Sequence, residues 1–364
     1  MNPFQIDADI TKAHTIHTDF YTSESVFEMS KELIFAKSWQ YIGGVHLLKD
    51  NNIHPFILLE KFIDEPLVLI QNEKGDIRCC SNVCTHRGNL LANEPCKSKK
   101  LICKYHGRRF DLDGHFKFMP EFELAANFPT QNDNLAQLPI FQLGALYYTA
   151  LTKIDPNLFF KEMLDRVSYL PIQQMEYRKD LSTIYHVKAN WALYVENYLE
   201  GFHIPFVHNS LNAVVDYGTY STEIFEYCNL QLGLGKQEDA CFDIPSGHQD
   251  AGKSVVAYYF WVFPNMMFNF YPWGLSFNYV EPTGLDSCKV SFEVYVWDES
   301  KLEKGAGSGL HQVEMEDEAI VENVQKGVKS RFYTQGRFSP TRETGPHHFH
   351  QLLAKALESS KLKT

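Results

Sequence analysis

The chain has 364 residues, 44% of them hydrophobic and 22% charged, which is the composition of a globular protein with about two domains. Its formal net charge of −11 argues against a nucleic-acid binder, because no basic field is available to neutralise phosphates. Eight cysteines without an apolar N-terminal signal, and no apolar run of membrane-spanning length, predict a cytoplasmic protein whose thiols are free or bind metal.

The elements predicted along the chain alternate between helical and β-rich regions. Residues 1–40 have helical periodicity and are expected to be a lead-in that packs on the second domain. Residues 41–150 contain short β-rich runs separated by glycine and aspartate turns, which indicates a small β domain. Residues 151–364 are expected to form a mixed domain with an antiparallel sheet, built from a helix at 188–203, strands across 219–298 and a helix at 311–330. The predicted fold class is therefore α+β.

Two short motifs in the β-rich region each pair a thiol with an imidazole. They are Cys84-Thr-His86 and Cys103-Lys-Tyr-His106, and together they supply a four-ligand site of two cysteines and two histidines. A c-type haem needs C-x-x-C-H, which is absent, and a conventional zinc finger orders its ligands Cys, Cys, His, His. The order here is similar to the Rieske [2Fe–2S] motif, with structural zinc as the alternative.

Other residues around these motifs have simpler expected roles. Gly88 and Gly107 follow the two histidines and are expected to let the backbone wrap the cluster and point N–H groups at sulfur. Cys96 lies between the motifs, and neither spacing makes it a ligand. The remaining cysteines are expected to be small buried hydrophobic residues: Cys79, Cys80, Cys228, Cys241 and Cys288.

A second cluster of metal-binding residue types lies in "NWALYVENYLEGFHIPFVH", residues 190–208. An apolar stripe from Trp191 to Phe202 predicts a packed helix, and Pro205 is expected to end it so that the imidazole of His208 can swing towards His203. Glu200, one turn before His203, is placed to hold that imidazole by its N–H. By itself this pattern also fits a polar cluster without metal.

Taken together, the "CTHRG", "CKYHG" and "NWALYVENYLEGFHIPFVH" segments and a late acidic helix resemble the α subunits of Rieske non-haem iron oxygenases, the ring-hydroxylating oxygenase family. The resemblance implies an N-terminal all-β Rieske domain and a helix-grip catalytic domain around a mononuclear iron. It implies that Cys84, His86, Cys103 and His106 hold the [2Fe–2S] cluster.

The same resemblance assigns the mononuclear iron and its electron supply. His203 and His208 match the two histidine ligands of a 2-His-1-carboxylate site. Asp317 is the expected carboxylate, because it lies on the apolar stripe of 311–330 and matches the family's late aspartate; Glu314, Glu316 and Glu318 are expected to be solvated. In the family, the acidic residue at the position of Glu200 bridges a histidine of this iron to a Rieske histidine of the neighbouring subunit, which implies a homotrimer.

The expected reaction uses O2 and single electrons from NAD(P)H that arrive through a separate reductase or ferredoxin, since the chain has neither a dinucleotide-binding fingerprint nor a plant-type ferredoxin motif. The length, Glu200 and the aromatic segment 257–279 resemble the choline- and betaine-oxidising branch, and aromatic rings can hold a quaternary ammonium group. Methyl hydroxylation or N-demethylation of such a compound is the first expectation, and hydroxylation of an aromatic ring is the alternative. A non-catalytic Rieske electron carrier and a zinc-stabilised binding module are the hypotheses from other classes.

Overall fold

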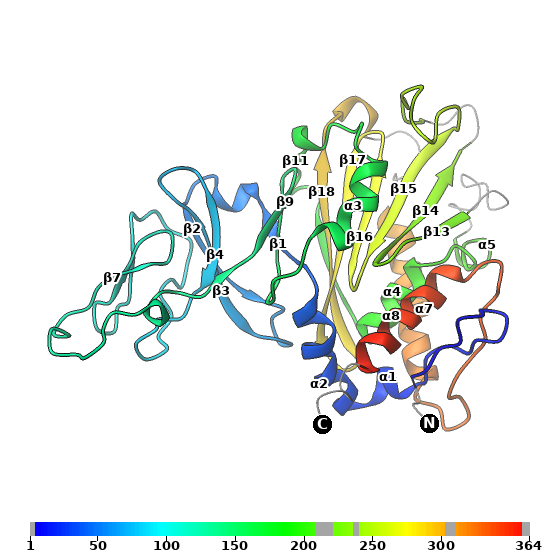
Figure 1. Cartoon of the computed structure of the whole chain (residues 1–364). Coiled ribbons are helices and arrows are strands. Elements are labelled where there is room, and N and C mark those ends of the chain that lie inside the picture. Colours follow the sequence, from blue (N-terminus) through cyan, green and yellow to red (C-terminus); the bar gives the residue numbers. More distant parts are fainter. Residues whose placement is uncertain (1–3, 209–220, 236–239, 303–309, 359–364) are drawn as a thin grey trace. The chain divides into compact units, whose positions relative to one another are not determined.

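The protein consists of two compact units. The computed structural model describes residues 4–208, 221–235, 240–302 and 310–358. The smaller unit is Trp39–Ile154, and the larger unit joins Met1–Ser38 to Asp155–Thr364 (Figure 1). These limits lie within a few residues of the expected ones, and they assign the N-terminal segment to the same unit as the second half of the chain.

The smaller unit is built from three antiparallel sheets. Their strand orders are β1-β10-β9, β2-β3-β4-β8 and β5-β6-β7. The strands are β1 (Gln40–Gly44), β2 (Ile53–Leu58), β3 (Glu65–Gln71), β4 (Ile77–Ser81), β5 (Leu101–Ile102), β6 (Arg109–Phe110), β7 (Phe116–Phe118), β8 (Gln137–Leu138), β9 (Ile140–Leu143) and β10 (Leu146–Thr149).

The core of this unit extends under the two cysteine-histidine segments. Val68 and Ile70 of β3 are fully buried, and Cys84 and Cys103 belong to the same hydrophobic cluster as these side chains. Burial of apolar surface, at about 25 cal/mol per Å², therefore holds both segments against one core. Cys84 and Cys103 are therefore both fixed in this core, one in each cysteine-histidine segment.

The larger unit contains one eight-stranded antiparallel sheet. The strand order is β11-β18-β17-β16-β15-β14-β13, and β12 also pairs with β18. The strands are β11 (Glu176–Tyr177), β12 (Thr183–Val187), β13 (Ser221–Ile224), β14 (Cys228–Leu234), β15 (Val255–Val262), β16 (Met266–Tyr271), β17 (Gly274–Gly284) and β18 (Ser287–Val296). The strands expected in 219–298 and the α+β fold class are confirmed.

Helices cover both faces of this sheet. On one face, Tyr198 of α4 donates a hydrogen bond to Asn269 of β16, and Trp261 of β15 packs against Phe349 of α8. On the other face, Phe160 of α3 contacts Phe268, whose side chain alternates with that of Asn269. The helices are α1 (Asp19–Thr22), α2 (Glu24–Leu33), α3 (Asn157–Arg166), α4 (Trp191–Tyr198), α5 (Ile204–Val207), α7 (Leu310–Gly327) and α8 (Thr344–Glu358).

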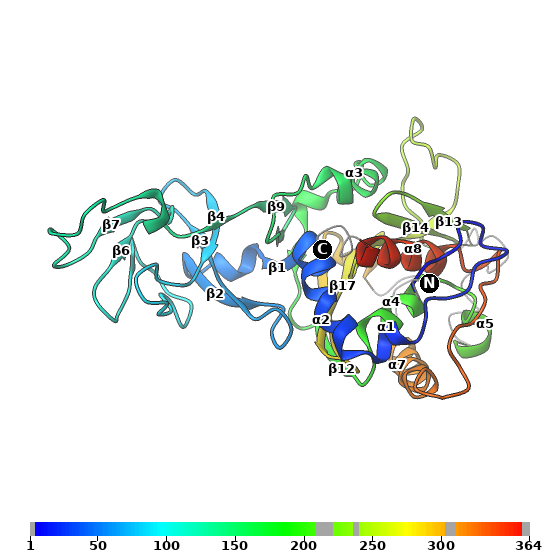
Figure 2. The same ribbon diagram turned by 60° about the horizontal axis from the view of Figure 1, so that its bottom comes forward.

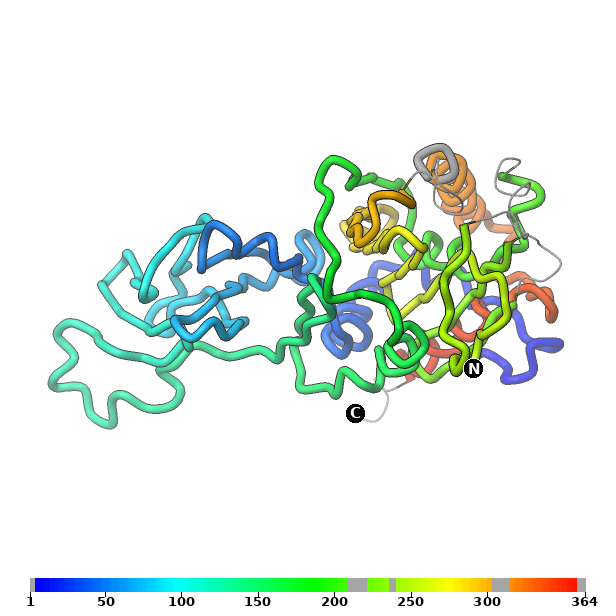
Figure 3. Tube along the Cα trace, turned by 90° about the horizontal axis from the view of Figure 1, so that it is seen from above, coloured from blue at the N-terminus to red at the C-terminus, as the bar shows by residue number. Residues whose placement is uncertain are grey.

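The N-terminal segment lies beside the C-terminal one within the larger unit (Figures 2 and 3). The backbone N–H of Thr15 donates to the carbonyl of Gly336, and the N–H of Ile16 donates to Nδ1 of His350. The helical prediction for 1–40 holds only for 19–33, because residues 4–18 pair with the 334–350 region instead. Within the described ranges, no helix is long and apolar enough to cross a membrane.

Candidate metal centres

The two cysteine-histidine segments form a matched pair of turns. The N–H of Gly88 donates to the carbonyl of Cys84 at 3.0 Å, and the N–H of Gly107 donates to the carbonyl of Cys103 at 2.9 Å. Both glycines have left-handed φ values, +72° and +75°, which other residues adopt only with strain. The two glycine N–H groups close their turns onto carbonyl oxygens, and the backbone N–H groups that reach sulfur, as expected of these turns, are those of His86 at Cys84 and of Tyr105 and His106 at Cys103.

The four side chains of these turns come together. Cys84 and Cys103 are both buried, their thiols lie within hydrogen-bonding reach of each other, and the ring centroids of His86 and His106 are 4.8 Å apart. Nδ1 of each histidine is buried and has no hydrogen-bond partner among the described residues. Two thiols beside two imidazole nitrogens that lack a partner fit a metal cluster held by both residue types.

The two thiols differ in their surroundings. Burial raises the pKa of the Cys84 thiol. Burial also opposes ionisation of Cys103, but backbone N–H groups of Tyr105 and His106 and the side chain of Asn89 outweigh it, so the pKa of Cys103 is lowered. Backbone and side-chain donors directed at a thiolate stabilise the deprotonated form that binds metal.

Three further residues support this site and were not predicted. Nδ2 of Asn89 donates to Sγ of Cys103 at 3.6 Å, and the ring of Tyr105 lies against His106 with centroids 3.7 Å apart. Arg108, only 2% exposed, donates to the Asp133 carboxylate at 2.6 Å. The sequence does not predict a buried ion pair for Arg108, because its partner Asp133 is distant along the chain.

The remaining cysteines lie elsewhere. Cys96 is half-buried and pairs with Ile53 through backbone hydrogen bonds. Of the cysteines expected to be buried hydrophobic residues, Cys241 is only half-buried, whereas the others are buried: Cys79, Cys80, Cys228 and Cys288.

In the larger unit, His203, His208 and Asp317 converge on one point. Oδ1 of Asp317 lies 3.0 Å from Nε2 of His208 and 3.5 Å from Nε2 of His203, and one ligand atom from each of the three residues lies within 4.8 Å of the others. Two imidazole nitrogens and one carboxylate oxygen are a donor set that binds divalent iron and leaves positions open. Asn197 donates to the same Oδ1 at 2.7 Å and so fixes the carboxylate.

The local chain path around the two histidines differs from the prediction. The expected helix over 188–203 is wrong beyond Tyr198, where α4 ends, and a second short helix, α5, begins after His203. Pro205 lies in the first turn of α5 rather than ending a helix, since a proline there loses no intrahelical hydrogen bond. Phe202, placed on the packed stripe by periodicity, is 40% exposed because it lies outside α4.

Each imidazole has a carboxylate on its other nitrogen. Nδ1 of His203 lies 2.7 Å from Oε1 of Glu200, and Nδ1 of His208 lies 2.7 Å from Oε2 of Glu316. Burial lowers the pKa of His208, but the carboxylates of Asp317 and Glu316 outweigh burial, and the pKa is raised. Glu316, expected to be solvated, is thus only partly exposed and binds a buried imidazole.

The inward face of α7 also differs in part from the prediction. Glu314, expected to be solvated, is buried and accepts a hydrogen bond from the Tyr194 hydroxyl at 2.6 Å. Burial raises the pKa of Glu314 to about 8. Val321 is buried, whereas Ile320 and Val324 are exposed. The buried face of α7 is therefore rotated about the helix axis from the face that the apolar residues alone predict.

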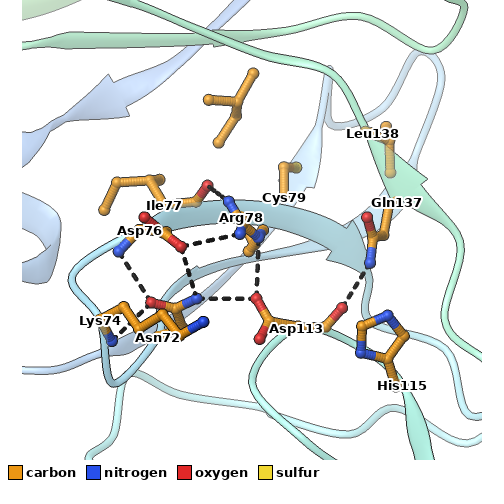
Figure 4. Close-up of a pocket in the computed structure, with 11 residues that line it drawn as sticks. Asn72, Lys74, Asp76, Ile77, Arg78, Cys79, Asp113, His115, Gln137 and Leu138 are labelled. Carbon is orange, nitrogen blue, oxygen red and sulfur yellow. Dashed lines mark hydrogen bonds and ion pairs between the residues drawn. The ribbon is translucent and has the colours of Figure 1, made fainter.

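A separate polar pocket lies on the smaller unit (Figure 4). Its centre is a chain of paired groups: Asn72 and Arg78 both donate to Asp113 Oδ1, at 2.9 and 3.0 Å. Gln137 donates to the carbonyl of Asp113. None of the predicted ligands lines this pocket, and its mutual pairing indicates a structural role in holding β4 and β8.

Both units match known families. Residues 38–129 match the Rieske [2Fe–2S] domain, and residues 174–359 match the catalytic domain of the ring hydroxylating alpha subunit. The fold and the two matches define a Rieske-type oxygenase, and the chain belongs to the ring-hydroxylating α-subunit family. The predicted family is confirmed, and with it an oxidoreductase that uses a [2Fe–2S] cluster, a mononuclear iron, O2 and electrons from a partner.

Two curated relatives are similar over almost the whole chain. Choline monooxygenase of Arabidopsis thaliana is 29% identical, over 94% of this chain and 83% of its own length. The carnitine monooxygenase oxygenase subunit of Escherichia coli K12 is also 29% identical, over 98% of this chain and 97% of its own.

Solved structures agree with this fold. The quaternary ammonium Rieske monooxygenase CntA in complex with L-carnitine superimposes with a TM-score of 0.73 at 24% identity, covering 96% of each chain. Naphthalene 1,2-dioxygenase with bound indole reaches a TM-score of 0.71 at 16% identity, covering 99% of this chain and 96% of its own. The fold alone is therefore common to enzymes with different substrates.

Proposed function

We propose that this protein is the terminal oxygenase of a monooxygenase system that hydroxylates a methyl group of, or N-demethylates, a small quaternary ammonium compound. The observation that carries the proposal is the end-to-end similarity to choline and carnitine monooxygenases. Hydroxylation of an aromatic ring is less favoured, because the similarity to naphthalene dioxygenase supports only the fold.

In this proposal the two sites divide the work. Cys84, His86, Cys103 and His106 hold the cluster; the two adjacent thiols and the two Nδ1 atoms that find no hydrogen-bond partner in the described part of the chain support this assignment. His203, His208 and Asp317 hold the mononuclear iron, supported by their convergence within 4.8 Å. When bound, the cluster supplies single electrons and the iron supplies a binding place for O2.

The residues of the second site keep its imidazoles in the form that binds metal. With Glu200 and Glu316 placed to accept from the Nδ1–H groups, Nε2 of each ring is left on the side of Asp317, where it can bind a metal ion. Asn197 keeps Oδ1 of Asp317 directed at the same point. The surplus negative charge of three carboxylates favours a divalent cation there.

Electrons reach the iron, in this proposal, through Glu200 from the His106 of a neighbouring copy, so that the enzyme works as a homotrimer. Exposed aromatic side chains at both ends of this route support a protein contact there: Tyr105 is 58% exposed and Phe206 is 78% exposed. A separate reductase or ferredoxin reduces the cluster.

The substrate is proposed to meet uncharged polar and aromatic groups of the sheet. Gln231 and Asn269 lie on the face that contacts Tyr198, and the strand registers place Tyr259 and Ser276 beside them in the same row. Aromatic faces and amide oxygens suit a cation that cannot donate hydrogen bonds.

The test is a substrate panel with the purified protein and a surrogate reductase. Choline, betaine and carnitine are compared with simple arenes for substrate-dependent O2 consumption and product formation, after the absorption spectrum and iron and sulfide assays have established the metal content. We expect Rieske absorption and coupled turnover with at least one quaternary amine. Zinc in place of iron, or turnover of arenes alone, would contradict the proposal.

A further inference from the structure

Glu316 and Asp317 hold the same imidazole from opposite ends. Oε2 of Glu316 lies 2.7 Å from Nδ1 of His208, and Oδ1 of Asp317 lies 3.0 Å from Nε2 of the same ring. The two nitrogens of an imidazole point away from each other. Glu316 therefore cannot replace Asp317 as a ligand at the Nε2 side without leaving its present contact.

The support of His208 comes from a different part of the chain than the support of His203. Glu200 is three residues before His203 and reaches its Nδ1 locally. Glu316 reaches His208 across more than one hundred residues of sequence, from the helix α7 that also carries Asp317. A single helix thus positions one carboxylate on the metal side of the ring and one behind it.

Burial makes the contact with Glu316 specific. The His208 side chain is 1% exposed, so solvent cannot substitute as an acceptor for its Nδ1–H, whereas the Glu316 side chain is 31% exposed and keeps part of its hydration. A buried imidazole without an acceptor would lose either its orientation or its tautomer.

We infer that Glu316 is a positioning residue for the mononuclear iron: its carboxylate fixes the tautomer and the ring orientation of His208 so that Nε2 faces the metal. This inference rests on the proposed function, since it presupposes an iron at His203, His208 and Asp317. Metal binding then depends on two adjacent residues of α7, Glu316 and Asp317, and therefore on the orientation of α7 about its own axis.

The experiment measures iron binding rather than turnover. Mononuclear iron is removed with a chelator from the full-length protein while the Rieske absorption is monitored, and Fe(II) is then titrated back anaerobically to obtain its dissociation constant. The variants are Glu316→Ala, Glu316→Gln and, as a matched control on the same helix, Glu322→Gln. Glu322 accepts a hydrogen bond from the Lys188 backbone, away from the imidazoles, and a glutamine retains that acceptor.

We expect Glu316→Ala to weaken Fe(II) binding about 10- to 100-fold, and Glu316→Gln to recover part of the loss because its amide oxygen still accepts from Nδ1–H. The electron paramagnetic resonance spectrum of the nitric-oxide complex of Fe(II) should change in the alanine variant and stay unchanged in Glu322→Gln. Circular dichroism melting separates a folding defect from this effect.

The outcomes separate the inference from the proposed function. Wild-type affinity and an unchanged spectrum in Glu316→Ala, or an equal loss in Glu322→Gln, would overturn the role of Glu316 and leave the oxygenase proposal standing. If the wild-type protein binds no Fe(II) that depends on Asp317, as judged with Asp317→Ala, the proposed site itself fails and the inference fails with it.

Discussion

The carboxylate of Glu200 binds both the imidazole and the backbone N–H of His203. Oε1 of its carboxylate lies 2.7 Å from Nδ1 of the imidazole, and Oε2 accepts a hydrogen bond from the backbone N–H of His203 at 3.1 Å. The backbone N–H of Phe202 donates to the same oxygen. The carboxylate is thus fixed by its own turn.

The first prediction concerns Glu200→Gln. Its amide can still contact His203 but loses the negative charge, so we expect iron and cluster to stay bound while electron transfer between them slows about 10- to 100-fold. Single-turnover kinetics, with cluster oxidation followed by absorbance, measure this rate. Glu226→Gln, at an exposed position, is the control and should behave as wild type. A normal rate in Glu200→Gln would place the electron route elsewhere.

The second prediction concerns His203→Ala. Removing one of three ligand atoms should abolish mononuclear iron binding and turnover, because two remaining ligands hold a divalent ion poorly, while the Rieske spectrum stays intact. Iron per chain, visible absorption and product formation are the measurements. His186→Ala changes an exposed histidine of β12 and should affect none of them. Persistent activity in His203→Ala would mean that the iron lies at another place.

Apart from Asp317, which came from the family resemblance, the parts of both sites that were predicted from the sequence are those encoded by short spacings. The Cys84 and Cys103 motifs and the Glu200–His203 pair lie within one turn or loop each, so local geometry already brings their members together. Glu316 was missed because adjacent residues of α7 point in different directions, and only the packing of α7 against α4 decides which of them reaches His208. The local sequence pattern does not determine how α7 is rotated about its own axis when it packs against α4.

The same physical reason explains the errors in burial. Ile320 and Val324 look like core residues by periodicity, yet they are exposed, while the polar Glu314 is buried by a partner on α4. Tertiary contacts override amphipathic pattern where a polar side chain finds a hydrogen-bond partner inside. The fold class depends on the hydrophobic pattern of many residues, so errors in the predicted burial of a few residues do not change it.

The third prediction concerns the buried Arg108. Its guanidinium donates to Asp133, lies over the ring of Phe116 at 4.8 Å, and its backbone carbonyl accepts from the N–H of Cys103. Arg108→Ala removes the buried guanidinium from the Asp133 carboxylate, whose side chain is 19% exposed, and we expect a loss of about 1–3 kcal/mol in the free energy of unfolding of the smaller unit. The urea midpoint of the visible circular dichroism of the cluster measures it.

Arg109→Ala is the matched control for that experiment. Arg109 is exposed, and among the described residues its side chain contacts only the ring of Phe118, so its removal should change the free energy of unfolding by about 0.5 kcal/mol or less. Equal effects of the two substitutions would show that the buried ion pair does not stabilise the cluster segments.

The fourth prediction concerns pH and His348 of α8. Burial against Trp261, opposed by a hydrogen bond to the backbone of Glu226, lowers the pKa of His348 to about 4, whereas the unfolded chain has a value near 6.5. Between these values the unfolded state binds the extra proton, so the free energy of unfolding falls as the pH falls below 6.5. The loss attributable to this group is about 2 kcal/mol at pH 5.

His348→Gln removes the titrating group and should flatten this part of the stability profile. Urea unfolding of the two proteins at several pH values between 7.5 and 4.5 measures the difference, with His186→Gln as an exposed control. Other groups titrate in the same range, but they do so in both proteins, so the difference isolates His348. If the variant loses stability on acidification as steeply as the wild type, the pKa of His348 is not lowered by burial in the folded protein, and the prediction is wrong.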